Sequence, residues 1–296
     1  MRASTAIGLV LALASTTLTN LAYLREHDAA AALPCLTLRR PLRSAHLLLT
    51  DRSWMVGFAF EGGGFLLYAV ALGLASLALV QSVGAGGIGL LAFASSRIAR
   101  RPLGVRERAG VLLAVVGLIA LAISLSGASG EGTGGSTITI LVWICASAGC
   151  AALVLTLGRH LLGAAIANGL AGGLFFSIGD FSTKLVTQGG THTAFLVTVV
   201  LGYLLGTSLL QVGYQSGGAL TVAGLATLLT NAVPIAAGTI VLHEPVPSGA
   251  AGGLRILAFA AVSAGAVLLA KPEHPAGKGT PRGGHEAVFD PPPAAG

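Results

Sequence analysis

The sequence predicts an all-α polytopic membrane protein with about nine transmembrane helices. Of its 296 residues, 54% are hydrophobic and 9% are charged, whereas soluble domains carry roughly 25% charged residues. The stretch 54–98 contains one acidic residue, Glu61, and no basic residue before Arg97. A helix needs about 20 apolar residues to cross a bilayer, so this stretch is long enough for two spans. Backbone groups in lipid must be satisfied within the segment, which makes helices the expected form.

The first apolar run, residues 7–24, is expected to remain in the protein as a membrane helix. A cleaved signal peptide is the alternative, because Ala12-Leu13-Ala14 resembles a cleavage site. Cleavage would send the basic segment that follows, residues 25–52, to the outer side of the membrane. The positive-inside rule disfavours that orientation, and retention is therefore the preferred interpretation.

The other spans are recognised as apolar runs between polar or glycine-rich breaks. They are expected at about 54–73, 75–97, 109–126, 137–157, 161–186, 193–213, 218–242 and 251–270. Residues 25–53 are too interrupted by Pro34 and Pro41 to span, although 42–50 suits a short amphipathic helix at the membrane surface. The tail, 271–296, holds six of the twelve prolines and is expected to be disordered.

The distribution of basic residues predicts the orientation in the membrane. Nine spans place alternate loops on opposite sides, and one side then collects 14 Lys and Arg residues while the other has three. Because Lys and Arg accumulate in cytoplasmic loops, the richer side is expected to face the cytoplasm. The N-terminus is then outside and the C-terminus inside, in a cell membrane. The basic residues serve as topology signals in this interpretation, and no nucleic-acid partner is expected.

An internal repeat is expected from two stretches that align when the sequence is shifted by 142 or 143 residues. The shift matches the run from Leu67 with the run from Leu209, and Pro102 with Pro245. The expected organisation is a first four-helix repeat over 1–126, a linker helix within 127–160, a second repeat over 161–270 and a disordered cytoplasmic tail over 271–296. Because a single linker helix lies between the two repeats, the second repeat would cross the membrane in the opposite orientation to the first. Inverted repeats are a common transporter plan, with the substrate site between the halves.

In this plan the chain resembles the drug/metabolite transporter superfamily, and within it the nine-helix branch that includes the NIPA-type magnesium transporters and their actinobacterial relatives. The segments that carry the resemblance are Trp54–Gly57, Leu67–Gln81, Arg100–Pro102, Gly110–Gly117 and Leu220–Pro245. The chain has Gln81-Ser82 where such relatives often have Gln-Pro, and Arg100-Arg101 and His243-Glu244 where they often have Glu-Arg. The resemblance implies transport, of Mg²⁺ or of another small solute.

Glu61 and Asp180 are the two acidic residues, of eleven, that fall inside the predicted spans. A carboxylate within the membrane typically faces the bundle interior or a water-filled path, where it binds a cation or relays a proton. Lys184 lies at i+4 from Asp180 and could neutralise it in a local ion pair at the membrane edge. Glu61 has no basic residue within four positions, and its alternative role is that of a hydrogen-bonded packing residue.

Three uncharged polar residues complete the candidate site: Asn231, Gln81 and Tyr203. Pro234 follows Asn231 and would free a backbone carbonyl one turn earlier, beside the amide of Asn231. Such unwound carbonyls coordinate substrates or ions in transporters, although a helix–helix hydrogen bond is the alternative for Asn231 and for Gln81. Tyr203 occupies the position in the second half that matches Glu61 in the first.

We therefore expect a secondary transporter that works by alternating access, with Glu61, and Asp180 as second choice, binding a coupled proton or cation. The alternatives are a divalent-cation (Mg²⁺) transporter and a non-transporting membrane scaffold or lipid-interacting protein. An enzyme is not expected, because no nucleophile–base set or P-loop is present and the glycines of 84–89 follow no strand. No cofactor is expected. The expected partners are membrane lipids and a small-molecule or ion substrate, and a homodimer is one option for assembly.

Overall fold

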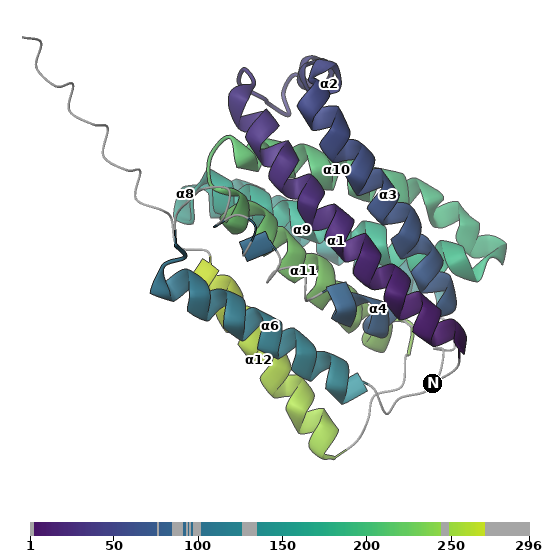
Figure 1. Cartoon of the computed structure of the whole chain (residues 1–296). Helices are drawn as coiled ribbons and strands as arrows, with labels where there is room; N and C mark the ends of the chain where they lie inside the picture. The colour runs from purple at the N-terminus through teal and green to yellow at the C-terminus, as the bar shows by residue number, and fades with distance from the viewer. Residues whose placement is uncertain are drawn as a thin grey trace, which may run out of the picture.

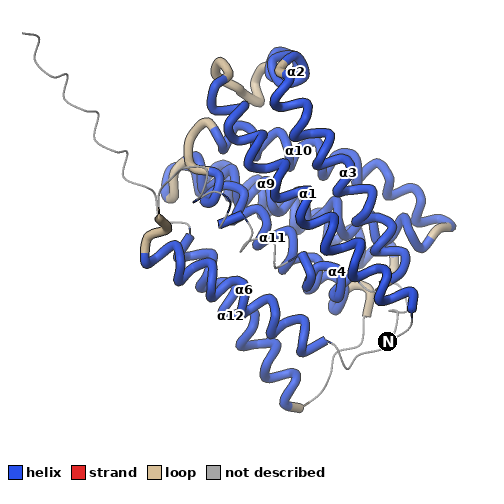
Figure 2. Tube along the Cα trace, in the orientation of Figure 1, coloured by secondary structure: helices blue, strands red, loops and turns tan. Residues whose placement is uncertain are grey.

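The computed structural model describes residues 3–75, 77–84, 91–92, 94, 96, 102–125, 135–243 and 249–269. Within these residues the chain is helical and contains no strand (Figure 2). The expected all-α class is therefore confirmed. Most of the second half of the expected span at 75–97, and the expected disordered tail, fall outside the described residues.

The helices follow one another with short connections. They are α1 (Ala3–Ala32), α2 (Pro41–Thr50), α3 (Arg52–Leu74), α4 (Leu77–Gly84), α6 (Val105–Leu125), α7 (Thr137–Leu153), the π-helical turn η1 (Val154–Gly158), α8 (Arg159–Leu161), α9 (Ala164–Gln188), the 3₁₀ segment η2 (Gly190–Phe195), α10 (Leu196–Tyr214), α11 (Ala219–Ile240) and α12 (Ala250–Leu269).

Six helical segments among the described residues are long and apolar enough to cross a membrane. They are Ser4–Ala32, Arg52–Leu74, Thr137–Leu161, Ala164–Gln188, Gly190–Tyr214 and Ala219–Ile240. Six of the nine expected spans therefore meet this criterion of length and composition within the described part of the chain.

The expectation that the first helix ends near Leu24 is wrong. Helix α1 continues to Ala32 through the sequence REHDAAAA, which is rich in good helix formers and free of Gly and Pro. The extension carries Glu26 into the candidate span Ser4–Ala32. Glu61 and Asp180 are consequently not the only acidic residues inside the helices. The chain then breaks at Pro34 and re-enters a helix at Pro41, the first residue of α2, where proline is favoured.

Helices α1 and α3 pack as a close antiparallel pair. Gly8 lies against Leu74 near one end of the pair and Gly64 lies against Thr19 further along, where Ser15 Oγ donates to Gly64 O at 2.7 Å. Small residues at such positions allow two helix backbones to approach closely in a membrane. This pair forms one wall of the central bundle, in front of α9 and α11 in Figure 1.

The second half contributes a similar pair, in which α9 packs against α10, and α11 covers another side of α9. Gly202 of α10 faces the backbone of α9, since a Cβ atom there would lie 2.8 Å from Gly179 N and from Phe175 O. Helices α6 and α12 form a separate pair along one flank of the bundle (Figure 1), with Gly265 of α12 against Ala114 of α6.

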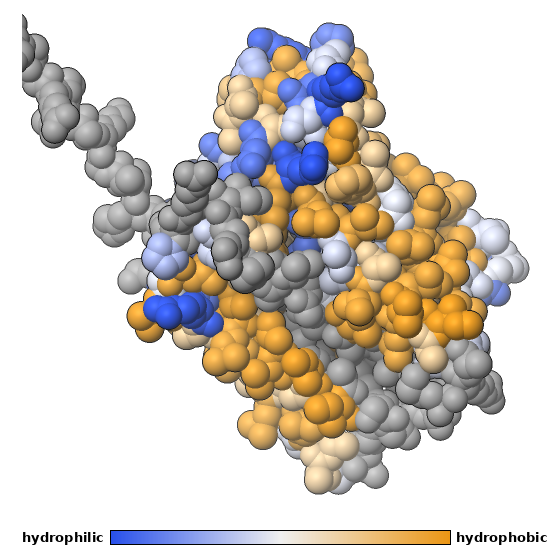
Figure 3. Space-filling model, in the orientation of Figure 1, coloured by the Kyte–Doolittle hydropathy of each residue, from blue (hydrophilic) through white to orange (hydrophobic). Residues whose placement is uncertain are grey.

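Apolar side chains cover much of the outer surface. Leu66 of α3, Leu112 of α6, Val197 of α10 and Ile256 of α12 are all exposed. Figure 3 shows this apolar surface over the sides of the bundle, with hydrophilic residues gathered at the end that carries α2. So large an exposed apolar area in a monomer marks contact with membrane or protein rather than with water.

Candidate functional site

A cavity of about 560 Å³ lies inside the bundle. Residues of α1, α3, α4, α9, α10 and α11 form its walls, and residues of α2 and of the preceding loop line one end. Its volume falls in the range of sites that hold small molecules, about 300–1,000 Å³. Glu61 and Asp180 are the charged residues of the described lining, which contains no Lys, Arg or His.

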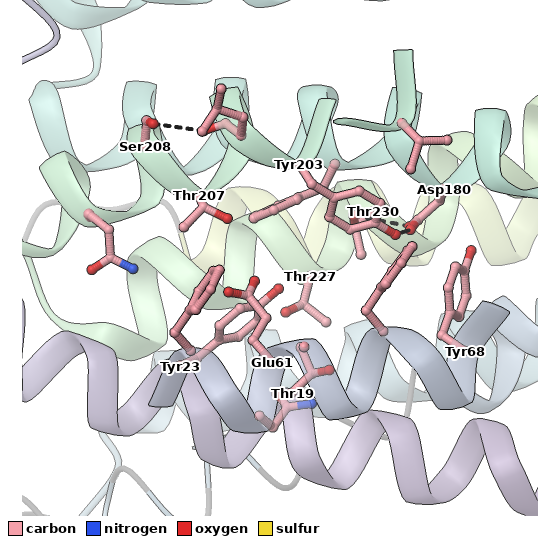
Figure 4. A pocket seen from close by; sticks show the side chains of 18 of the residues that line it. Thr19, Tyr23, Glu61, Tyr68, Asp180, Tyr203, Thr207, Ser208, Thr227 and Thr230 are labelled. Atoms are coloured by element: carbon pink, nitrogen blue, oxygen red, sulfur yellow. Dashed lines mark hydrogen bonds between the residues drawn. The ribbon is translucent and has the colours of Figure 1, made fainter. Parts of the chain in front are cut away.

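Asp180 is anchored near one end of the cavity by hydroxyl and amide groups from three other helices. It is 5% exposed. Its carboxyl group accepts hydrogen bonds from the hydroxyl of Tyr203, from Gln81 Nε2 at 3.1 Å and from Thr230 Oγ1 at 3.4 Å. The Gln81 amide also donates to the hydroxyl of Tyr68 at 2.8 Å. Figure 4 shows Tyr203, Thr230 and Tyr68 around Asp180. These donors fix the orientation of the carboxyl group.

Glu61 lies further along the same cavity, on α3. Figure 4 shows its carboxyl group near Tyr23 and Thr19 of α1, with Thr207 and Thr227 across the cavity. Its Oε2 atom is buried and has no hydrogen-bond partner among the described residues. The environment of Glu61 therefore differs from that of Asp180, because Glu61 lacks a matching set of donors.

Glu26 of α1 lies beside Glu61, and sequence reasoning missed it. The Glu26 side chain is fully buried. Gln211 Nε2 of α10 donates to its Oε2 at 2.5 Å, whereas its Oε1 has no partner among the described residues. The carboxyl groups of Glu26 and Glu61 are close enough to interact directly. The uninterrupted helix-forming sequence after Leu24 was the signal that could have placed Glu26 inside the first span.

Asn231 lines the cavity from α11. Its Nδ2 atom donates to Thr227 O at 2.7 Å, one turn earlier on the same helix. Helix α11 continues past Pro234 to Ile240. The side chain of Thr230, beside Asn231, is the group that reaches Asp180.

Lys184 lies outside the cavity lining, unlike the other five candidates. Its Nζ atom donates to Leu72 O at 3.0 Å and to Ala75 O at 3.2 Å. These carbonyls belong to the last turn of α3 and the residue after it, so the ammonium group caps the C-terminal end of that helix. Lys184 thus ties α9 to the end of α3.

The structure brings five of the six sequence-predicted residues to one cavity: Glu61, Asp180, Asn231, Gln81 and Tyr203. Residues that the prediction did not single out are Tyr68 and Thr230 beside Asp180, and Glu26 beside Glu61. Within the described part of the chain, no group of three or more His, Cys, Asp or Glu residues is placed to hold a metal ion.

Comparison with known proteins finds a distant relative. The chain is 24% identical, over 287 residues, to the "Probable magnesium transporter NIPA9" of Arabidopsis thaliana, with 88% of this chain and 80% of the relative covered. No protein-family profile matches the chain, and no solved structure matches it.

Proposed function

We propose that this protein is an integral membrane secondary transporter that moves a small, positively charged solute by alternating access. The observation that carries the proposal is the charge of the central cavity, where Glu61 and Asp180 face the space and no basic residue is found in the described lining. Carboxylates in a membrane interior are costly, and they occur where they meet a cation, a proton or water. A cation entering the cavity would offset that cost.

The aromatic lining of the cavity favours an organic cation. Phe65 and Tyr203 pack edge to face with ring centroids 4.8 Å apart, and Trp54 and Phe58 stack with centroids 5.0 Å apart. All four residues line the cavity. Aromatic faces attract cations, most strongly where water is excluded. An alkylammonium group could thus contact both rings and carboxyl groups.

The drug/metabolite type of transporter, with two inverted repeats, forms part of this proposal. Its support is the packing pattern: α1 with α3 in the first half, α9 with α10 in the second, and α4 with α11 and α6 with α12 across the halves. This pattern is expected if residues 1–126 and 161–270 are equivalent units. Alternating access would then be a rocking of one unit against the other around the cavity. In the proposed orientation α2 and the C-terminus face the cytoplasm.

Mg²⁺ transport is the second candidate, and the observation that favours it is the similarity to a probable magnesium transporter. Mg²⁺ binds carboxylate oxygens and keeps several of its waters. The cavity has room for a hydrated ion, and Glu61 and Asp180 could bind such an ion through its water shell. Both candidates place a cation in the same cavity, so the test must include both kinds of ion.

The proposal is tested by uptake into proteoliposomes containing the purified full-length protein. Labelled tetramethylammonium, a labelled polyamine and Mg²⁺ are compared with a labelled organic anion of similar size. We expect uptake of at least one cation, none of the anion, and loss of the cation uptake in Glu61→Gln and Asp180→Asn.

Asp28→Asn is the matched control, because Asp28 is an exposed carboxylate on α1 outside the cavity lining. Uptake should be unchanged in that variant. Uptake of the anion, or no uptake of any cation, would contradict the proposal. Absence of cation uptake, together with binding of the protein to anionic-lipid vesicles, would favour the scaffold alternative.

A further inference from the structure

We propose that Glu26 of α1 and Glu61 of α3 act as one carboxyl pair that holds a single exchangeable proton, and that this pair is the ion-coupling site. The coupling role rests on the proposed transport function, whereas the shared proton does not. The proposal assigns to Glu26 a function equal to that of Glu61, although Glu26 lies behind the cavity wall and only Glu61 lines the cavity.

The close approach of α1 and α3 brings the two carboxyl groups together. Gly57 lies one turn before Glu61 on the same face of α3. A Cβ atom at position 57 would lie 2.8 Å from Glu26 Cγ and 3.3 Å from Ala22 O. The absent side chain at Gly57 therefore makes room for the Glu26 side chain, which extends next to Glu61. A larger residue at position 57 would separate the two carboxyl groups.

The pair is short of hydrogen-bond donors. Its one described donor is Gln211 Nε2, which contacts Glu26 Oε2. Glu26 Oε1, Glu61 Oε2 and Gln211 Oε1 are buried without a partner in the described part of the chain. All three are acceptors when the carboxyl groups are ionised. One proton on the pair turns an acceptor into an O–H donor and removes one of two adjacent negative charges. The bound proton therefore supplies a hydrogen-bond donor and also relieves the repulsion between the two carboxylates.

Asp180 provides the contrast within the same cavity. Its carboxyl group accepts from Tyr203, Gln81 and Thr230. Acceptors that already have donors gain less from an added proton than acceptors that have none. The geometry therefore separates two roles, with Asp180 held as a positioned acceptor and the Glu26–Glu61 pair as the place where a proton binds and leaves.

The other titratable groups around the pair do not supply a counter-charge. Tyr23 on α1 and Tyr214 on α10 are close enough to interact with both carboxyl groups, and neither phenol carries a positive charge in any protonation state. Arg25 is exposed on α1, and its guanidinium group lies 5.4 Å from the Phe60 ring centroid. His27 pairs with Asp28 at 3.0 Å. Among the described residues neither Glu26 nor Glu61 forms a salt bridge.

Release of the proton from the Glu26–Glu61 pair is linked to the binding of a cation in the cavity. When a monovalent cation binds beside Glu61, the carboxylic O–H bond breaks and its proton passes to water in the cavity. The pair then carries two negative charges, one of which is offset by the bound cation, so the net charge of the site is unchanged. When the cation leaves, a proton from water restores the O–H bond. One proton is thus exchanged for one positive charge, without any change of oxidation state.

The shared proton is tested without any substrate, by infrared spectroscopy of the purified full-length protein titrated with acid and base. The C=O stretch of a protonated carboxylic acid is measured as a function of pH. In the pH range between the two titration steps of the pair, where it holds one proton, we expect the double variant Glu26→Gln/Glu61→Gln to lose the amplitude of one protonated carboxyl group. Each single variant should move the titration midpoint by about one pH unit or more, because strongly interacting carboxyl groups titrate as a pair.

Asp28→Asn removes an exposed carboxyl group of α1 and should leave the titration of the Glu26–Glu61 pair unchanged. An unaltered titration in Glu26→Gln, or a double variant that loses the amplitude of two groups in a single titration step, would overturn the shared proton. Gln retains an oxygen that accepts from Gln211, so the single variants should fold, and monodispersity in detergent checks this. The infrared result stands even if the protein transports none of the probes.

The coupling role is tested with whichever of tetramethylammonium and Mg²⁺ the wild type transports. In Glu26→Gln, accumulation driven by a pH gradient should fall about tenfold more than counterflow of the same ion, within the usual range of coupling between two sites. Equal losses in the two assays would overturn the coupling role. A wild type without any uptake would instead contradict the transport function on which that role rests.

Discussion

Tyr203 donates its hydroxyl hydrogen to Asp180 across the close contact between α10 and α9. The contact depends on the neighbour of Asp180, Gly179, because a Cβ atom there would lie 2.9 Å from Tyr203 Cδ2. The missing side chain allows the ring to pass over α9 and reach the carboxyl group. Gly179 and Tyr203 thus determine both the packing of α10 against α9 and the hydrogen bond that orients the Asp180 carboxyl group in the cavity.

Tyr203→Phe is expected to lower the stability of the protein by about 1–3 kcal/mol, because it leaves a buried acceptor without its donor. Thermal unfolding in detergent measures this change. Tyr214→Phe on the same helix is the matched control, since the Tyr214 hydroxyl is buried without a partner among the described residues. Its removal should leave stability unchanged or raise it. Equal destabilisation by the two variants would contradict the assigned hydrogen bond.

Lys184→Met is expected to destabilise the protein by about 3 kcal/mol or more. The variant removes hydrogen bonds from the ammonium group to Leu72 O and Ala75 O, and bonds from charged donors contribute about 1.5–3 kcal/mol each. Thermal unfolding is again the measurement. Arg159→Met, at an exposed basic residue on α8, should have little effect. An unfolding temperature equal to that of the wild type would show that Lys184 does not hold α9 to α3.

Gly202→Ala is expected to push α10 away from α9. The added Cβ atom would meet Gly179 N and Phe175 O at 2.8 Å, and backbone atoms cannot rotate away as a flexible side chain can. Overpacking of this kind costs about 1–3 kcal/mol. Gly149→Ala on α7 is the control, because nothing lies within 4 Å of its added Cβ atom.

The control variant should be as stable as the wild type or more stable, since Ala favours a helix over Gly by up to about 1 kcal/mol. Parallel thermal unfolding of the two variants gives the comparison. If Gly202→Ala unfolds no earlier than Gly149→Ala, the close contact between α9 and α10 is not required for stability.

The helical class and most of the cavity residues could be predicted from sequence because their signals are local. Long apolar runs identify the helices, and a carboxylate such as Glu61 or Asp180 within such a run must face the interior. Polar residues such as Gln81 follow the same rule. These arguments need only the length of a run and the position of a residue within it.

Glu26 and Lys184 could not be assigned this way because their partners are distant in sequence. Glu26 sits in a polar stretch, and its burial depends on Gln211, 185 residues away. Lys184 is spaced for an ion pair with Asp180, yet its long side chain reaches Leu72 O, 112 residues away. A spacing of four residues identifies side chains that are neighbours on one helix, and it gives no information about acceptors on another helix.

Gln215→Leu is expected to loosen the loop between α1 and α2. One side-chain amide holds this loop: Gln215 Nε2 donates to Ala30 O, Leu33 O and Pro34 O at 3.0–3.1 Å, and Oε1 accepts from Leu36 N at 2.7 Å. Leucine keeps the volume of the side chain and removes every one of these bonds, leaving backbone groups without partners at a cost of about 1–3 kcal/mol each where they stay buried.

Amide hydrogen exchange followed by mass spectrometry measures the effect on peptides that cover 33–40. Exchange there should become faster in Gln215→Leu, while peptides from the core of α9 keep the wild-type rate. Gln188→Leu, at an exposed glutamine at the end of α9, should leave the loop unchanged. Because Leu36 and Leu38 line the cavity at this end, a looser loop would also admit water more readily. Unchanged exchange at Leu36 would show that the loop is held by its own packing, and the amide of Gln215 would then have no part in closing this end of the cavity.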